Sequence, residues 1–171
     1  MKNNWQTKKL GEVCRITYGK GLPTKDLKEN GFPVFGANGI IGFNDKYLYE
    51  ESQVLISCRG AYSGKINFSP PLCFVTNNSL ILEIISNEDL DKRFLYYILH
   101  TVNKSKLVTG TAQPQVTINN AVELTFQLPP LETQHAIVSK IEELFSELDQ
   151  GIADLKTAQA QLKVYRQSVL K

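Results

Sequence analysis

Polar and basic side chains beside glycines are the part of this sequence best suited to binding a nucleic acid. Lysine and arginine neutralise phosphates, while arginine, asparagine and glutamine can form paired hydrogen bonds with base edges, each worth roughly 1–3 kcal/mol of discrimination. Neighbouring glycines allow the backbone to come close to a ligand. The candidates for DNA contact are Lys20, Lys25, Asn38, Arg59, Tyr62, Lys65, Asn77, Asn78, Gln113 and Gln115, with Thr111 in the same polar segment as the two glutamines.

Each candidate also has a purely structural interpretation. Asn38 lies in Ala-Asn-Gly, and asparagine before glycine is typical of a turn. Asn77 and Asn78 can equally cap or turn a strand, and Gln113 can hold its own loop in place. The sequence therefore predicts a group of possible DNA contacts and leaves open which of them touch bases.

Other kinds of chemistry have little support. The chain has no GxGxxG loop, P-loop, HExxH motif or placeable Ser-His-Asp arrangement, and no Asn/Asp-Pro-Pro-aromatic motif of a methyltransferase. Its three cysteines are far apart, which predicts reduced thiols rather than a disulfide framework or a zinc site. Neither His100 nor His135 has a ligand at metal-binding spacing. We expect no catalysis, no metal and no cofactor bound by this chain.

The candidates must be positioned by the first part of the chain, residues 1–130. All seven prolines lie there, and its short apolar runs are rich in β-branched and aromatic residues. These runs predict strands within residues 12–19, 33–43, 53–62, 65–68, 73–85 and 122–128. One helix is expected within residues 87–108, with an apolar stripe formed by Leu90, Phe94, Tyr97, Ile98 and Val102. The predicted fold class is α+β, a mixed and mostly β globular domain followed by one long helix.

The second part, residues 131–171, has a seven-residue apolar repeat and no proline. Apolar residues at both seam positions over more than four heptads predict a coiled coil. Pro129 and Pro130 separate this arm from the first part, and Thr133 or a neighbour is expected to cap the helix. The residues predicted to pair are Ile141, Leu144, Leu148, Leu155, Ala158, Leu162 and Val169.

Charge is distributed unevenly along the chain. The net charge is +2, and residues 1–130 contribute +3, which is modest for a DNA-binding domain and predicts weak, salt-sensitive binding. Residues 131–154 carry −5 and residues 155–171 carry +4. Antiparallel pairing, with a second copy or a related helix, places opposite charges side by side. Part of this bias also fits the helix dipole, which favours acids early and bases late.

Nothing in the sequence resembles a membrane span or a signal peptide, so we expect no membrane association and a cytoplasmic location.

Several segments in order resemble the specificity (S) subunit of type I restriction-modification enzymes. They are KLGEVCRITYGKGLP, PVFGANGIIGF, VLISCRGAYSGKINF, FVTNNSLIL, GTAQPQVTINN and FQLPPLETQHAIVSKIEELF. The resemblance covers nearly the whole chain, and its most specific part is the LPPL-E-x-Q-x-x-IV junction before the heptad helix. It implies one target-recognition domain, residues 1–130, followed by one conserved helix, residues 131–171.

The resemblance implies a non-catalytic reader of one half of a bipartite site in double-stranded DNA. Methyltransferase (M) subunits would dock on it, restriction (R) subunits would join through them, and S-adenosylmethionine, ATP and Mg would be bound by these partners. Members of the family usually carry two recognition domains and two helices, whereas this sequence has one of each. It looks like a half subunit that forms a homodimer through an antiparallel coiled coil, naturally short or cut from a longer gene.

Two other hypotheses stay open. A non-catalytic protein-interaction module with a coiled-coil dimerisation arm explains the helix equally well, but it does not explain the ordered motifs of the first part. The chain could also be the recognition domain of a fused restriction-methylation enzyme, whose catalytic motifs would lie elsewhere in the parent gene.

Overall fold

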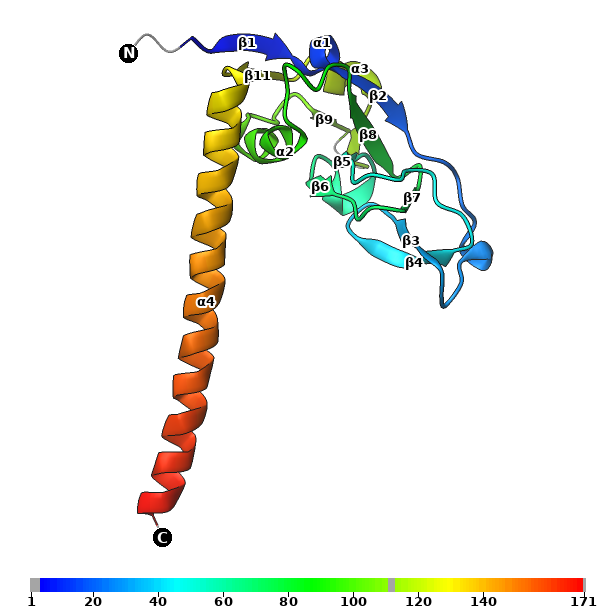
Figure 1. The fold of residues 1–171 in the computed structure, drawn as a ribbon. Coiled ribbons are helices and arrows are strands. Elements are labelled where there is room, and N and C mark those ends of the chain that lie inside the picture. The colour runs from blue at the N-terminus through cyan, green and yellow to red at the C-terminus, as the bar shows by residue number, and fades with distance from the viewer. Residues whose placement is uncertain (1–3, 111–112, 171) are drawn as a thin grey trace. The chain divides into compact units, whose positions relative to one another are not determined.

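The computed structural model describes residues 4–110 and 113–170 of the chain. The chain divides into two compact units, residues 1–134 and 135–171. Sheets dominate the first unit and a single long helix forms the second (Figure 1). The prediction of an α+β class with a long C-terminal helix is confirmed.

Two sheets and two short strand pairs make up the β structure. The four-stranded antiparallel sheet has the order β2 (Cys14–Tyr18), β8 (Ser79–Ile84), β5 (Val54–Ser57) and β6 (Ile66–Phe68). The three-stranded sheet has the order β4 (Ile40–Asn44), β3 (Phe32–Phe35) and β7 (Phe74–Val75), with β3 and β7 parallel. The short pairs are β1 (Gln6–Lys9) with β11 (Thr125–Leu128) and β9 (Val108–Thr109) with β10 (Gln115–Val116).

The helices are few and mostly short. The α-helices are α1 (Leu10–Val13), α2 (Lys92–Thr101), α3 (Ile118–Val122) and α4 (Leu131–Val169), and the 3-10 turns are η1 (Thr24–Asp26) and η2 (Gly60–Tyr62). No helix in the described part of the chain is long and apolar enough to cross a membrane.

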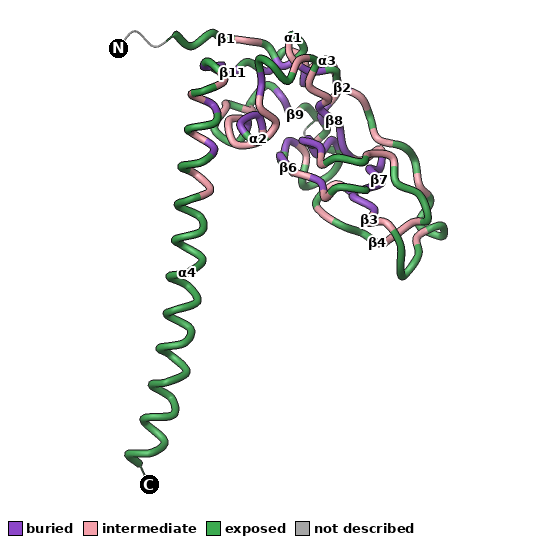
Figure 2. Tube along the Cα trace, in the orientation of Figure 1, coloured by how far each residue is buried: buried purple, intermediate pink, exposed green. Residues whose placement is uncertain are grey.

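The core lies around the central strands β5 and β8. Residues 54–56 and 80–82 are fully buried on both faces of the sheet, which explains why both strands are continuous apolar runs (Figure 2). Leu55 and Ile81 pack with Phe35, Cys73 and Val75, so the three-stranded sheet covers one face. Helix α2 packs on β5 and β6.

Helix α2 is shorter than predicted. The Asp91 side chain accepts a hydrogen bond from the Phe94 N–H at 2.8 Å, so the helix begins only at Lys92. Its buried face consists of Phe94, Leu95 and Leu99. The predicted stripe was therefore partly wrong. Tyr97 and Ile98 are only half-buried, while Leu90 is buried before the helix and Val102 follows its end.

The strand predicted within residues 122–128 begins late, at Thr125, because Val122 still belongs to α3. Strand β11 pairs with β1, which the sequence analysis did not predict, in the register Gln6 to Leu128. The Leu10 N–H extends this pairing by donating to the Leu124 carbonyl at 2.8 Å. The two ends of the first unit are thus joined by main-chain bonds.

Helix α4 begins directly after the two prolines. The Thr133 N–H donates to the Pro130 carbonyl at 2.9 Å, so Thr133 lies inside the first helical turn and is not the cap, which corrects the sequence prediction. Proline suits this position because it needs no N–H donor there.

Gln134 is a fully buried polar residue in that first turn. Its Oε1 accepts from the Asp91 N–H at 2.9 Å, and its Nε2 donates to the carbonyls of Asp89 and Pro129, both at 2.8 Å. Every one of these groups belongs to residues 1–134. The buried amide therefore fastens the first turn of α4 to the segment that leads into α2.

We expect Gln134→Ala to lower the free energy of unfolding by about 2–3 kcal/mol, because it leaves buried main-chain groups without partners. Urea unfolding followed by circular dichroism measures this change. Gln127→Ala is the matched control, since the Gln127 side chain is exposed and donates to the exposed Thr7 hydroxyl, and it should change stability by less than about 0.5 kcal/mol. Equal effects of the two substitutions would contradict the role given to Gln134.

Gly19 lies where strand β2 passes the β7–β8 turn. Its N–H donates to the Ser79 carbonyl at 3.1 Å, and a Cβ at this position would lie 2.2 Å from the Thr76 carbonyl oxygen. At Gly21 the nearest atom to such a Cβ, Asn77 Nδ2, is 3.9 Å away.

Gly19→Ala should therefore destabilise the protein by about 1–3 kcal/mol, the usual cost of forcing extra atoms into a packed site. Gly21→Ala should be nearly neutral, since the space is open there. Thermal unfolding of the two variants side by side tests this difference, and an unchanged midpoint for Gly19→Ala would refute the close approach.

Candidate nucleic-acid interface

The candidate residues gather at one end of the four-stranded sheet. Strand β2 ends opposite the start of β8, where Tyr18 pairs with Leu80, and β5 ends opposite the same point, where Ser57 pairs with Ser79. The loops that follow β2 and β5 therefore lie beside the turn that precedes β8. These three segments contain Lys20, Arg59, Asn77 and Asn78.

Main-chain hydrogen bonds join these segments in a row. The Lys20 N–H donates to the Val75 carbonyl at 3.0 Å, and the Asn77 N–H donates to the Lys20 carbonyl at 3.1 Å. On the other side of the turn, the Cys58 N–H donates to the Asn78 carbonyl at 2.9 Å. The order across the surface is thus Lys20, then the two asparagines, then the Cys58–Arg59 segment.

The row continues to the glutamine segment. Arg59 pairs with Gln115 in an antiparallel bridge, the Val116 N–H donates to the Cys58 carbonyl at 3.0 Å, and the Gly60 N–H donates to the Pro114 carbonyl at 3.2 Å. Gln113, Gln115 and Arg59 line one surface hollow together with Gly60 and Ala61. Thr111 lies outside the described residues.

A second group forms around Lys65. Its Nζ donates to Asn38 Oδ1 and lies 5.7 Å from the centre of the Tyr62 ring, a distance at which a cation is attracted to the ring. Tyr62 is half exposed. Tyr62 and Lys65 lie in the loop between β5 and β6, whereas Asn38 lies in the turn between β3 and β4, so the fold brings together side chains that are up to 27 positions apart.

Asn38 occupies the turn between β3 and β4, as its structural interpretation suggested. The Gly36 N–H donates to the Gly39 carbonyl at 2.8 Å, and Gly39 has a φ of +132° that favours glycine. The buried hydroxyl of Ser79 donates to the Gly36 carbonyl at 2.9 Å, and that of Ser57 donates to the Ala37 carbonyl. These bonds tie the turn to the same end of the four-stranded sheet.

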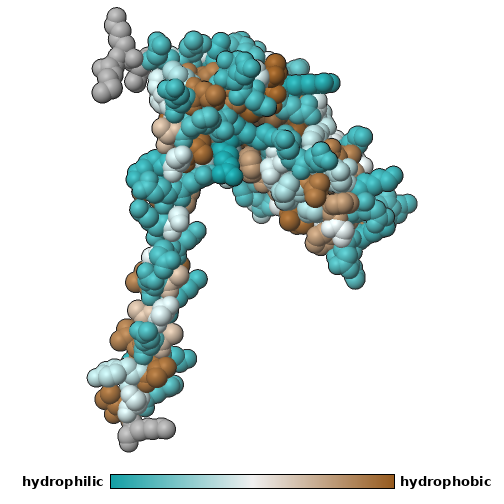
Figure 3. Space-filling model, viewed as in Figure 1, coloured by the Kyte–Doolittle hydropathy of each residue, from teal (hydrophilic) through white to brown (hydrophobic). Residues whose placement is uncertain are grey.

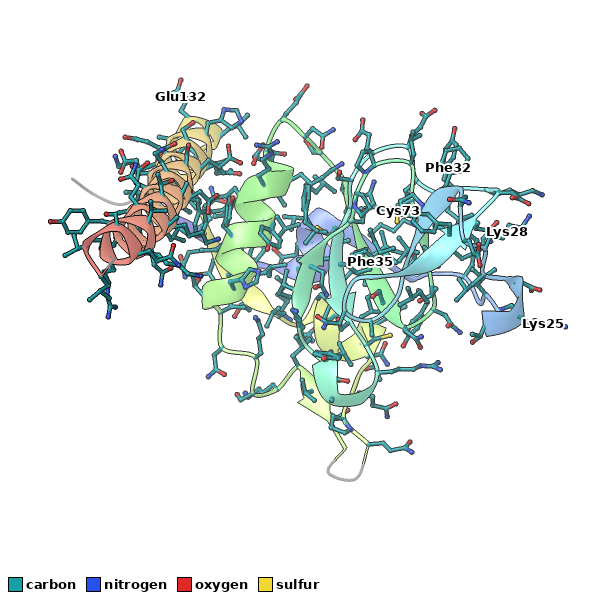
Figure 4. The ribbon with its side chains drawn as sticks, turned by 90° about the horizontal axis from the view of Figure 1, so that it is seen from below. Lys25, Lys28, Phe32, Phe35, Cys73 and Glu132 are labelled. Carbon is teal, nitrogen blue, oxygen red and sulfur yellow. The ribbon has the colours of Figure 1, made fainter. Side chains whose placement is uncertain are left out.

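Lys25 is placed differently from the other candidates. It lies in η1, on the same edge of the first unit as Lys28 (Figure 4). Lys28 forms an ion pair with Asp45 and its backbone pairs with Phe43. None of the bonds described above includes Lys25, so the described contacts do not connect it with the other nine candidates.

Two titratable residues, His100 and Lys104, were not among the predicted candidates, and the charges of Lys65 and Lys104 both act on His100. Burial lowers the pKa of His100, and Lys104 and Lys65 lower it further by repulsion. Burial also lowers the pKa of Lys104. In the sequence, Tyr96, His100 and Lys104 follow one another at intervals of four residues. This spacing alone did not indicate a binding site, because the interaction of His100 with Lys65 depends on the fold.

The cysteines do not supply reactive groups. All three are free and buried. Burial raises the pKa of Cys14 to about 12 and that of Cys73 to about 11, and it also raises the pKa of Cys58. Such thiols stay protonated at neutral pH and are poor nucleophiles. Within residues 4–110 and 113–170, no three metal-ligating side chains come together.

Helix α4 carries its heptad residues on the surface. Ile141 is half-buried, while Leu144, Leu148, Leu155, Ala158, Leu162 and Val169 are exposed. Leu155 exposes 72% of its surface, and apolar residues recur along the helix (Figure 3). A helix of 39 residues is about 58 Å long at 1.5 Å per residue.

Comparison with known proteins gives one consistent family. Residues 2–156 match the family model described as "Type I restriction modification DNA specificity domain". The specificity subunit of the type I restriction enzyme EcoprrI from Escherichia coli is 22% identical over 86% of this chain and 37% of its own length. A putative specificity subunit from Haemophilus influenzae is 30% identical over 80% of this chain and 36% of its own length.

Solved structures agree. The S subunit of a type I restriction-modification system from M. genitalium aligns with a TM-score of 0.75 at 19% identity, over 87% of this chain and 41% of its own. The HsdS subunit from Thermoanaerobacter tengcongensis aligns with a TM-score of 0.63 at 26% identity, over 93% of this chain and 41% of its own. The chain thus spans about two fifths of the length of these relatives. It belongs to the family of type I restriction modification DNA specificity domains.

Proposed function

We propose that this chain is a non-catalytic specificity module that reads one half of a bipartite sequence in double-stranded DNA. Residues 1–130 act as the target-recognition domain, and residues 131–171 act as the spacing and pairing arm. The module docks methyltransferase subunits and, through them, restriction subunits in the cytoplasm. S-adenosylmethionine, ATP and Mg belong to those partners.

The observation that supports DNA reading is the row of loops at one end of the four-stranded sheet. Main-chain bonds hold Lys20, Asn77, Asn78, Arg59 and Gln115 next to one another. Because the bonds use backbone groups, the side chains are left available for phosphates and base edges. The arginine and glutamine side chains suit guanine and adenine respectively.

The arm is proposed to pair with a second copy in an antiparallel coiled coil. Its exposed heptad residues form a seam that requires a partner, and unpaired apolar stripes of this kind typically mark interaction sites. Antiparallel pairing places residues 131–154, with a charge of −5, against residues 155–171, with a charge of +4. A two-fold pair of this kind would read a palindromic bipartite site.

The alternative function is a protein-interaction module, because such a module would use the same helical pairing arm. The two functions differ in what residues 1–130 do. In a protein-interaction module these residues would bind duplex DNA without sequence preference or not at all. The same domain could also belong to a fused restriction-methylation enzyme. Selection of bound duplexes from a random pool at low salt separates DNA reading from the protein-interaction alternative.

Arg59→Ala should weaken binding to the selected duplex roughly 5- to 150-fold, the equivalent of about 1–3 kcal/mol. Arg59→Lys should retain the salt dependence but lose the sequence preference, because lysine cannot form the same planar pair of bonds. Arg15→Ala is the control, because it also removes one positive charge. Arg15 is exposed and lies in β2, opposite Glu83 of β8. Fluorescence anisotropy with selected and scrambled duplexes measures all four proteins. Selection of no sequence by the unaltered chain would count against DNA reading.

Light scattering tests the arm. The unaltered chain should have a mass of about 38 kDa, twice the 19.2 kDa of one copy. Leu148→Gln combined with Leu155→Gln should reduce the mass to that of a single chain, because glutamines one heptad apart in the seam would bury polar groups in the pair. Ala153→Gln with Ala160→Gln changes outward positions and should leave the pair intact. Retention of the paired mass by the leucine variant would reject this seam.

A further inference from the structure

The last turn of α2 carries a stack of aromatic rings that places His100. The His100 ring lies edge-on to Tyr96 with ring centres 4.8 Å apart, and Tyr96 in turn lies 5.6 Å from Phe68 in β6. Strand β6 begins at Ile66, directly after Lys65. The stack therefore fixes the C-terminal end of α2 against the strand that follows Lys65.

The loop after α2 brings a second lysine to the same place. The Leu107 N–H donates to the Lys104 carbonyl at 2.9 Å, and the Leu107 side chain is buried. This turn packs against the residue before Lys65, since a Cβ at Gly64 would lie 2.8 Å from Val108 Cγ2. This contact places the turn after α2 beside the segment that holds Lys65, and the charges of Lys65 and Lys104 both act on His100.

Among the described residues, none of these three groups forms an ion pair with a carboxylate. Lys65 contacts the neutral side chains of Asn38 and Tyr62, and the charges acting on His100 are those of Lys104 and Lys65. Strands β5, β6 and β11, which pack against α2, contain no charged residue. The ion pair of Lys92 with Glu51 lies at the opposite end of the helix. An anion is the missing complement of this cluster.

We propose that Lys65, His100 and Lys104 form an anion subsite that holds a DNA phosphate and takes up one proton at His100 when it is filled. The identity of the anion rests on the proposed function. Lys65 joins this subsite to the DNA-reading loops through Asn38 and Tyr62. The subsite therefore adds the end of α2 to the interface.

The direction of the pH effect follows from the charges. In the free protein burial and the two lysines hold the pKa of His100 below its usual value of 6.5. A bound phosphate offsets their repulsion and raises that pKa, so the complex binds more protons than the free protein. Affinity should then increase as pH falls through the interval between the two pKa values, by at most about tenfold per pH unit for one proton.

Nuclear magnetic resonance can test the subsite without DNA. The chain has two histidines, so the spectrum of His100→Gln assigns both rings. Sulfate, compared with chloride at equal ionic strength, should raise the pKa of His100, and the ring resonances of His135 serve as the internal reference. In Lys65→Gln combined with Lys104→Gln, the His100 pKa should start higher and no longer respond to sulfate. A His100 pKa that ignores sulfate in the unaltered chain would overturn the subsite.

DNA binding at pH 6 and pH 8 tests which anion occupies it. The unaltered chain should bind duplex more tightly at pH 6, His100→Gln should lose this difference, and His135→Gln should keep it. A full pH difference in His100→Gln, or no difference in the unaltered chain, would overturn the assignment to a DNA phosphate. If sulfate shifts His100 but no duplex binds at either pH, the anion subsite stands and the DNA-reading function fails.

Discussion

The pairing of β5 with β8 is the constraint on which the rest of the first unit depends. Both strands are buried on both faces, so their main-chain groups can be satisfied only by each other and by the flanking strands β2 and β6. The register of Ser57 with Ser79 fixes where this pairing ends. The two serine hydroxyls then attach the β3–β4 turn at the same point. The β5–β8 pairing thus determines which loops lie next to one another at this end of the sheet.

Much of the fold could be predicted from the sequence because the main strands are local apolar runs. Residues 53–62 and 73–85 have the β-branched pattern of buried strands and contain β5, β7 and β8. Strand β1 could not be predicted in this way, since its residues are polar and its partner β11 is more than one hundred positions away. The start of α2 was predicted too early because Asp91, inside an apparently helical segment, caps the N-terminus of the helix.

The candidate site was predictable in its residue types but not in its arrangement. Arginine, asparagine and glutamine beside glycine indicate loops that can touch a ligand. The proximity of Arg59 to Gln115 depends on a bridge across 56 positions, which no local pattern encodes. His100 and Lys104 were missed for the same reason, because their relevance comes from Lys65 on another segment. The seven-residue repeat predicted α4 well, since the periodicity of a helix is a local property.

The way in which the loops are joined has a consequence for how this domain can change. Lys20, Asn77, Asn78, Arg59 and Gln115 are held in their row by bonds from their own or adjacent peptide groups. A new side chain at any of these positions finds the same backbone support already in place. Under the proposed function, a change of DNA target would therefore require only new side chains at these exposed or half-buried positions, while the backbone that joins the loops stays the same.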